Sequence, residues 1–523
     1  MKKILVTFIS LFLCMGEIFS QNSLFPTPAH VKNMKGIYQL GKSVQINSNG
    51  GYADKMAASL KATLDERNLA GKATSGPIRL ELDYHSGMKP EAYQLQVYPD
   101  SVVMKASSHA GLFYAKEAFL QAALFQKGKI KACMVVDEPR YSWRGFMLDE
   151  SRHFFGKEKV KQYLDLMASL HLNVFHWHLT DTDAWRIEIK RYPKLTVEGA
   201  VGNAHDPKAP AVFYTQEDVK EIVAYAAERH IMVVPEFDMP GHASAICQSY
   251  PEISGGGEGR WKHFTFHPCK EETFEFIGNV IDELITMFPA PYIHIGGDEV
   301  HFGNQSWYTD PEIQQFIKDH KLANEVELEH YFLRRVSKML TAKGKITLGW
   351  DELVDAGVNP ENSLVIWWHH DKKYKLVQAL EAGYDVVMSP RLPLYADFNQ
   401  YKDEKYGRTW QGYCPIEDIL TFPQPIIHLT QDYEDQVKGM QFSLWTERVS
   451  DIKRLDYMVF PRLIAVAESA WTPAKQKSNS LFMSKLPTFL EWLDAKGIYY
   501  FNPFNPASTP EPAREKLYTG PRL

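Results

Sequence analysis

The sequence predicts an α/β fold in which a large (β/α)8 TIM barrel follows a small α+β domain. From Tyr141 onward, short apolar segments alternate with amphipathic helical segments, which is typical of parallel βα units. Eight apolar segments follow this alternation, and eight fit a closed barrel better than an open sheet. Before Tyr141, residues 78–82, 93–97 and 102–105 alternate apolar and polar side chains, as half-buried strands do.

These patterns divide the chain into four parts. Residues 1–20 are predicted to be a signal peptide, 22–137 an N-terminal α+β accessory domain, 138–500 the barrel and 501–523 a C-terminal tail. In the accessory domain, Asp100-Ser101 predicts a hairpin, and a helical apolar spacing follows over residues 111–125.

The N-terminus indicates export. A short basic start precedes an apolar run over residues 4–14 and a small residue, Ser20, in the order of a secretory signal peptide. A membrane anchor is the alternative, but the run is too short to span a bilayer. A lipoprotein site at Cys14 is disfavoured because Leu13 stands where a small residue is needed. We therefore expect a periplasmic or secreted bacterial protein without stable membrane insertion.

Charge and cysteine content exclude several classes. The net charge is -6, and no long run of Lys or Arg predicts a nucleic-acid partner. The cysteines beyond the leader, Cys133, Cys247, Cys269 and Cys414, are too few and scattered for a disulfide scaffold. A Cys247–Cys269 bridge stays open.

Polar and aromatic side chains follow most of the predicted barrel strands. These strands are residues 144–149, 173–179, 231–237, 292–296, 346–350, 364–368, 385–388 and 439–444. In a TIM barrel the carboxyl ends of the strands meet at the face that carries the active site. The sequence therefore predicts a site built from His176–Asp181, Pro235–His242, Asp298-Glu299, Trp350–Glu352, Trp367–His370, Pro393–Asp397 and Trp445–Glu447.

Asp298 and Glu299 are the leading acidic pair. Hydrolysis of a glycosidic bond usually uses two carboxyl groups, and aromatic rings beside them suit the apolar faces of sugars. Neighbouring side chains of a regular strand point to opposite faces, so the two carboxylates converge only where the strand breaks. Gly296 and Gly297 permit that break.

Metal binding is the rival interpretation of the polar cluster. Ligands could be assembled from His176, His178, Asp181, His242, His294 and His301. No HExxH or comparable spacing is present, however. We therefore expect hydrogen-bonding roles for the histidines, with no catalytic metal and no cofactor.

In order along the chain, the motifs resemble glycoside hydrolase family 20, the β-N-acetylhexosaminidases. The resemblance rests on Arg144-Gly145-Phe146-Met147-Leu148-Asp149 with Arg152-His153-Phe154, His176-Trp177-His178-Leu179-Thr180-Asp181, Pro240-Gly241-His242, His294-Ile295-Gly296-Gly297-Asp298-Glu299 and Gly349-Trp350-Asp351-Glu352. It implies an exo-acting, retaining enzyme that removes terminal β-linked N-acetylglucosamine or N-acetylgalactosamine from glycans.

The resemblance also implies substrate-assisted catalysis, in which the 2-acetamido oxygen of the sugar attacks the anomeric carbon and forms an oxazolinium intermediate. Glu299 should be the general acid and then the base, and Asp298 should hold the acetamido N–H. We expect a water-poor aromatic pocket to raise the pKa of Glu299.

Further roles follow from the same resemblance. Arg144, at the end of the first strand, and Glu447 should bind sugar hydroxyls, and Tyr395 should donate to the acetamido oxygen. Asp181 and His242 should support the acidic pair. The walls should be Trp350, Trp368 (preferred to Trp367) and Trp445, with Asp397 and Trp410 as further candidates in a loop that is hard to register.

Two other functions stay open. One is a glycan-binding protein that lacks catalysis, although the intact pair with Tyr395 favours an enzyme. The other is a glycosidase with a carboxylate nucleophile, Asp238 or Glu352. The preferred amino sugar, the linkage, the tolerance of sulfated sugars, release of one sugar or two, and the oligomeric state do not follow from the sequence.

Overall fold

The computed structural model describes residues 24–66 and 71–519 of the 523-residue chain. The predicted signal peptide, with Cys14, lies outside the described residues. The chain forms two compact units. The sheet unit contains the chain up to Arg140 with Leu166–His171 and Ala467–Ile498, and the barrel unit contains Tyr141–Asp165, Leu172–Val466 and the chain from Tyr499 onward.

The sheet unit is built on a six-stranded sheet of mixed direction. Its strands, in spatial order, are β1 (His30–Gln39), β8 (Lys129–Asp137), β6 (Tyr93–Val97), β7 (Val102–Ala106), β5 (Ile78–Leu82) and β3 (Ile46–Ser48). The antiparallel β6–β7 pair is the hairpin predicted at Asp100-Ser101. A short parallel pair, β2 (Gly41–Ser43) and β4 (Gly71–Thr74), accompanies the sheet.

Among the described residues, the sheet unit includes the helices α2 (Tyr52–Glu66), α3 (His109–Phe125) and α18 (Asn479–Ala495). The side chain of Ser108 caps α3 by accepting from the backbone N–H of Gly111, and the helix is buried along most of its length. Helix α18 falls within the range 138–500 predicted as barrel. It joins the sheet unit because Phe482 and Phe489 pack edge-on against Phe25, with ring centroids 5.3 and 5.5 Å away.

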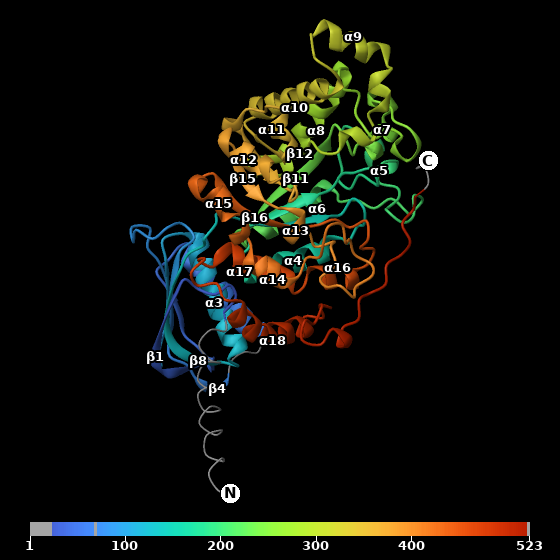
Figure 1. Ribbon diagram of the computed structural model, residues 1–523. Helices are drawn as coiled ribbons and strands as arrows, with labels where there is room; N and C mark the ends of the chain where they lie inside the picture. The colour runs from blue at the N-terminus through green and yellow to red at the C-terminus, as the bar shows by residue number, and fades with distance from the viewer. Residues whose placement is uncertain (1–23, 67–70, 520–523) are drawn as a thin grey trace. The chain divides into compact units, whose positions relative to one another are not determined.

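The barrel unit confirms the predicted (β/α)8 fold (Figure 1). Eight parallel strands close on one another in chain order, with β16 pairing back to β9. The strands are β9 (Trp143–Asp149), β10 (Val174–His178), β11 (Met232–Met239), β12 (Tyr292–Gly296), β13 (Ile346–Trp350), β14 (Ser363–Trp367), β15 (Asp385–Met388) and β16 (Val437–Leu444). Most of their residues are buried, because helices cover the outside and side chains fill the inside.

Helices surround this barrel (Figure 1). The longer ones are α4 (Lys157–Ser169), α6 (Gln216–Ala227), α8 (Glu271–Met287), α9 (Pro311–Asp319), α10 (Glu325–Ala342), α12 (Lys373–Glu381), α16 (Ile452–Val459) and α17 (Arg462–Trp471). Short ones are α5 (Lys194–Val197), α7 (Ser244–Ser249), α11 (Glu352–Asp355), α13 (Arg391–Leu394), α14 (Ile416–Thr421) and α15 (Ile427–Thr430). Local sequence fixes the start of α6, where Thr215 and Asp218 form a capping box.

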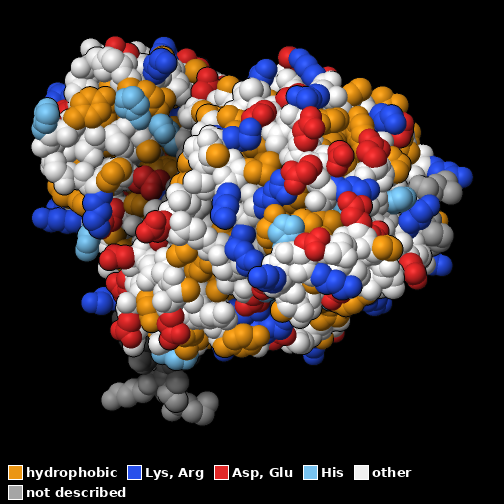
Figure 2. All heavy atoms as spheres, turned by 90° about the horizontal axis from the view of Figure 1, so that it is seen from above, with side chains coloured by type: hydrophobic (Ala, Val, Ile, Leu, Met, Phe, Trp, Pro, Cys, Tyr) orange, Lys and Arg blue, Asp and Glu red, His pale blue; other side chains and the backbone are white. Residues whose placement is uncertain are grey.

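The remaining sequence questions concern cysteines, membranes and surface charge. Cys247 and Cys269 are both free and buried, so the bridge left open above is not formed. Among the helices of the described part, none is long and apolar enough to cross a membrane. On the face shown in Figure 2, Lys and Arg side chains lie interspersed with Asp and Glu.

Candidate active site

The carboxyl ends of the barrel strands surround a pocket of about 630 Å³. This volume lies within the range of about 300–1,000 Å³ that is typical of small-molecule sites. All the residues to which the family resemblance assigned a role at the site line the pocket, except Arg144. The carboxyl ends of the strands therefore bring together side chains that are widely separated in sequence, as predicted.

The turn after β12 brings the acidic pair into the pocket. Gly296 and Gly297 have φ angles of +65° and +102°, and Glu299 is itself left-handed at +54°. A Cβ atom on Gly296 would lie 1.6 Å from Oδ1 of Asp238, so only glycine fits there. The break turns two consecutive side chains toward one cavity, as predicted from the glycine pair.

The two carboxyl groups have opposite pKa shifts. Burial raises the pKa of Asp298 to about 7, with the charges of Glu299 and Glu236 adding to the effect against His242. Burial also acts upward on Glu299, but His242 and Arg152 outweigh it, so the pKa of Glu299 is lowered. The expected rise in the pKa of Glu299 is therefore wrong, because the prediction considered the aromatic walls and not the cations.

His242 is the nearer of these cations. Its Nε2 lies 3.6 Å from a carboxylate oxygen of Asp298 and 3.6 Å from one of Glu299, and its Nδ1 contacts Asp181 at 2.9 Å. Burial alone would lower the pKa of His242, but Asp181, Asp238 and Asp298 raise it well above the usual value. His242 is thus held as an imidazolium that faces both members of the pair.

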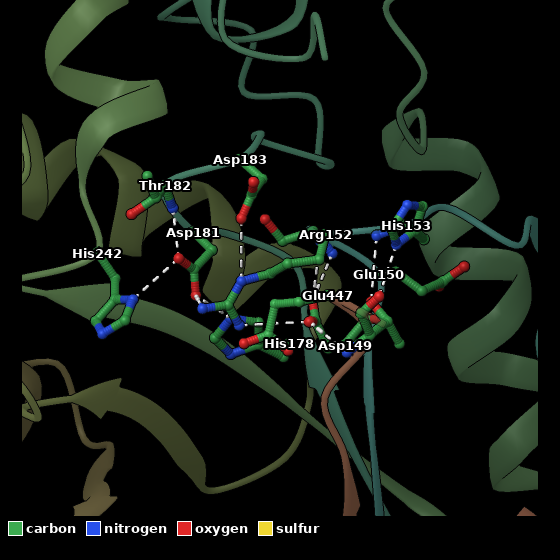
Figure 3. A network of polar contacts seen from close by, with 12 residues as sticks. Asp149, Glu150, Arg152, His153, His178, Asp181, Thr182, Asp183, His242 and Glu447 are labelled. Atoms are coloured by element: carbon green, nitrogen blue, oxygen red, sulfur yellow. Dashed lines mark hydrogen bonds and ion pairs between the residues drawn. The ribbon is translucent and has the colours of Figure 1, made fainter. Parts of the chain in front are cut away.

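Asp181 connects His242 to Arg152, as Figure 3 shows. Its carboxylate accepts from Arg152 Nη2 at 2.7 Å and contacts His178 Nε2 at 2.9 Å. These cations hold the pKa of Asp181 well below its usual range despite its burial. The network keeps Asp181 ionised and fixes both His242 and Arg152.

Below the pocket, a buried carboxylate with three histidines supports Trp350. Glu236 Oε1 lies 2.9 Å from His294 Nδ1 and accepts from Trp350 Nε1 at 3.2 Å. Its other oxygen contacts His176 at 3.1 Å and His178. These groups compensate one another within the barrel, and through Glu236 they hold the indole of Trp350 in place.

Four aromatic side chains form one wall: Trp350, Trp368, Tyr395 and Trp445. Trp445 lies 5.8 Å from Trp350 and 6.2 Å from Tyr395, measured between ring centroids. Trp368 donates through Nε1 to Glu352 at 3.1 Å, whereas Trp367 is buried inside the barrel. The preference for Trp368 therefore agrees with its position.

Another part of the pocket lining carries paired charges. Arg408 donates to Asp397 and to Glu447, each at 2.6 Å, so these two carboxylates share one guanidinium. Arg408 also lies over the ring of Trp410, which is 54% exposed at the rim. This hydroxyl-binding side (Arg152, Asp397, Arg408 and Glu447) offers both donors and acceptors to a sugar.

The prediction for Arg144 was wrong in its placement. Strand β9 begins at Trp143 and ends at Asp149, so Arg144 lies at its amino end, fully buried, and donates to the carbonyl of Tyr141. Arg152, three residues beyond the strand, reaches the pocket instead. Arg152 belongs to the same sequence motif as Arg144, and its position just after the strand is the signal that indicates the pocket residue.

Arg408 and Glu236 were also missed. Glu236 lies in the strand-end segment that the sequence singled out, but an acidic residue inside a strand gave no reason to prefer it to Asp238. Arg408 lies in the irregular stretch between β15 and α14, where no periodic pattern sets the register.

Asp238 and Glu352 were the alternative nucleophiles. Burial, together with neighbouring Asp298, raises the pKa of Asp238 well above the usual value. Burial with Asp351 and Asp298 does the same for Glu352, which does not line the pocket. A protonated carboxyl is a poor nucleophile, so neither group suits a covalent step.

A barrel with an acidic pair, an aromatic wall and a hydroxyl-binding side defines the site of a glycoside hydrolase. Residues 141–474 match the model for the catalytic domain of glycosyl hydrolase family 20, and residues 21–138 match domain 2 of the same family. The chain belongs to glycosyl hydrolase family 20.

Characterised relatives agree with this assignment. The chain is 35% identical to a β-hexosaminidase of Porphyromonas gingivalis over 86% of its length and 32% identical to one of Vibrio furnissii over 86%. The match spans 60% of the Porphyromonas protein and 76% of the Vibrio one.

Solved structures show the same fold. An exo-β-N-acetylglucosaminidase of Vibrio harveyi, in complex with N-acetylglucosamine, superposes with a TM-score of 0.85 at 30% identity. That comparison covers 92% of this chain and 79% of the other. A β-N-acetylhexosaminidase of Bacteroides fragilis gives 0.79 at 29% identity, covering 91% and 96%.

Proposed function

We propose that the protein is an exo-acting, retaining β-N-acetylhexosaminidase that removes terminal β-linked N-acetylglucosamine or N-acetylgalactosamine from glycans. The observation that carries this proposal is the turn at Gly296-Gly297, which points Asp298 and Glu299 into one aromatic pocket. The complex of the Vibrio harveyi enzyme with N-acetylglucosamine supports the choice of sugar.

The proposed mechanism uses the substrate's own acetamido group as nucleophile. Its carbonyl oxygen attacks the anomeric carbon while Glu299 gives a proton to the departing glycosidic oxygen. Asp298 accepts from the acetamido N–H and stabilises the positive charge of the oxazolinium. Glu299 then takes a proton from water, which attacks the anomeric carbon and restores the acetamido group with retained configuration.

The pocket supports this division of roles. Tyr395, 5% exposed beside Trp445, is a phenol with its pKa raised well above 10 by burial, so it stays protonated and suits a donor to the acetamido oxygen. The raised pKa values of Asp238 and Glu352 favour their protonated forms, which disfavours both as the nucleophile of the covalent alternative. Substrate assistance requires no such group.

We also propose that the protein is exported to the periplasm or secreted, on the strength of the apolar leader at residues 1–20. Expression of the full chain in a Gram-negative host, followed by N-terminal sequencing of the exported protein, tests this. Recovery only as unprocessed chain in the cytoplasm would contradict it.

The catalytic proposal is tested with the 4-nitrophenyl β-glycosides of N-acetylglucosamine and of plain glucose. We expect turnover of the acetamido sugar alone. Glu299→Gln should lower kcat about 10²- to 10⁴-fold, as loss of a general acid does. Asp298→Asn should lower it about 10²- to 10³-fold through lost charge stabilisation.

Exposed Glu361→Gln is the matched control and should behave as the parent. Equal turnover of the plain glucoside would refute substrate assistance. Binding of N-acetylglucosamine without turnover by the parent would favour a glycan-binding protein.

A further inference from the structure

The C-terminal tail belongs to the barrel unit and runs along the barrel in an extended form. From Tyr499 to Thr519 it contains one short 3-10 turn, Pro506–Ser508, and no longer helix or strand. Figure 1 shows the red tail passing α16. The sequence assigned no role to this segment, and polar contacts hold it along its length.

The first anchor is Glu511. Its carboxylate accepts from Arg454 Nη1 at 3.1 Å and from the backbone N–H groups of Lys405 and Tyr406 at 2.7 and 3.1 Å. Arg454 also donates to the carbonyl of Pro512 at 2.7 Å, and its side chain is fully buried. The tail thereby fixes the loop that leads into Arg408, on the hydroxyl-binding side of the pocket.

The second anchor lies beside Arg152. The backbone N–H of Tyr518 donates to the carbonyl of Ala204 at 3.1 Å, and the N–H of Ala204 donates to the carbonyl of Arg152 at 3.0 Å. Glu515 lies 3.9 Å from His205, whose ring contacts His153 at 2.7 Å. The tail therefore bridges the two loops that carry Arg152 and Arg408.

Between these loops the tail itself enters the pocket lining. Leu517, Tyr518 and Thr519 line the cavity with Arg152, Arg408 and Glu447. We propose that the segment Leu517–Thr519 is the outer wall of the hydroxyl-binding side and limits the site to a terminal, unextended sugar. This inference rests on the proposed function and adds to it a determinant of specificity.

The segment can act on specificity because it occupies the space beyond the hydroxyl-binding side, where a second sugar would lie. The residues of the hydroxyl-binding side hold a sugar by hydrogen bonds. Hydrogen bonds to one sugar do not by themselves prevent a second sugar from being attached to it, if the pocket is open on that side. A covalently attached segment, pinned on both sides, excludes that second sugar by steric overlap. Exclusion of this kind is the repulsive element on which specificity often depends.

The test is a variant that ends at Lys516, so that Leu517 and all that follows are missing while the Glu511 anchor stays. The substrate is the 4-nitrophenyl glycoside of β-1,4-linked di-N-acetylglucosamine. The parent should release single N-acetylglucosamine first, because the terminal sugar occupies the pocket. The shortened variant should also release the intact disaccharide, raising the initial ratio of disaccharide to monosaccharide about tenfold or more.

Three further variants make the result specific. Leu517→Gly with Tyr518→Gly keeps the chain length and should raise the ratio in the same direction. Glu511→Gln weakens the anchor and should raise it less. Exposed Lys516→Ala is the control and should match the parent. An unchanged ratio in both the shortened variant and the double-glycine variant overturns the inference.

A binding measurement separates this inference from the proposed function. Calorimetry gives the Kd of 4-O-methyl-N-acetylglucosamine without turnover, and loss of the wall should lower this Kd about fivefold, because the wall no longer overlaps the group attached to the sugar. If the parent cleaves neither glycoside, the proposed function fails, and the wall is then judged by this Kd alone. An equal Kd in parent and shortened variant would, in that case, overturn the wall as well.

Discussion

Replacing Asp181 by Asn isolates the charge that organises the acidic pair. The Asp181 carboxylate contacts Arg152 at 2.7 Å and His178 and His242 at 2.9 Å. Asparagine keeps the shape and one acceptor oxygen, but it loses the negative charge. Its NH₂ group faces either Arg152 and His178, which contact one oxygen of Asp181, or His242 and the backbone N–H of Thr182, which contact the other. We expect the side chains that face the NH₂ group to turn away from their present positions.

The expected loss follows from these contacts. A hydrogen bond to a charged group contributes about 1.5–3 kcal/mol, and every 1.36 kcal/mol in the barrier is a factor of ten in rate. If the free energy of one such hydrogen bond is lost from the transition state because His242 is no longer held in place, kcat/KM should fall about 10- to 150-fold. The pKa of His242 should fall as well, because Asp181 is the largest of the groups that raise it.

The assay is steady-state hydrolysis of 4-nitrophenyl β-N-acetylglucosaminide across pH, at a temperature where both proteins are folded by circular dichroism. Asp165→Asn is the matched control, since Asp165 is half-exposed and pairs with Arg229 on the surface. Parent-like kcat/KM in Asp181→Asn would refute the reasoning. A uniform loss that vanishes when activity is corrected for the folded fraction would show a purely structural role.

Three further predictions concern the same pocket. The coupled acidic pair keeps its proton up to the pKa of about 7 at Asp298, so kcat/KM should fall as pH rises from about 7 to 9, and a flat profile there would contradict this. Gly296→Ala should lower the Tm and activity by more than Gly344→Ala, because its Cβ would meet Asp238 at 1.6 Å while nothing lies within 4 Å at Gly344. Arg408→Met should raise KM about tenfold with less effect on kcat, because both carboxylates of the hydroxyl-binding side lose their cation. A tenfold fall in kcat with an unchanged KM would show that Arg408 does not act in substrate binding.

The barrel was predictable because parallel strands buried on both faces are short apolar runs. The predicted bounds of β12, β13 and β15 agree with the structure at both ends, and the other strands differ by at most a few residues. Helix α18 was assigned to the barrel because the apolar face of a helix indicates that the helix packs against another element but does not identify that element. Its partner Phe25 lies more than 450 residues away in sequence.

The site was predictable wherever a side chain follows a strand directly. Arg144 and Arg152 show the limit: both stand in one motif, and only the direction of β9 decides which of them reaches the pocket. Arg408 and the tail enter the pocket from irregular segments, where no periodicity relates sequence to position. The lowered pKa of Glu299 depends on His242, from a different strand, so no local pattern announces it.

The opposite shifts of Asp298 and Glu299 agree with the proposed mechanism once substrate is considered. Without substrate, the pKa shifts favour the proton on Asp298, whose pKa is about 7, and an ionised Glu299 beside His242. An acetamido N–H needs an acceptor, so its arrival favours ionised Asp298, and the leaving oxygen needs an acid at Glu299. The proposed mechanism therefore needs the proton on Glu299 when substrate is bound, whereas the pKa shifts without substrate favour the proton on Asp298.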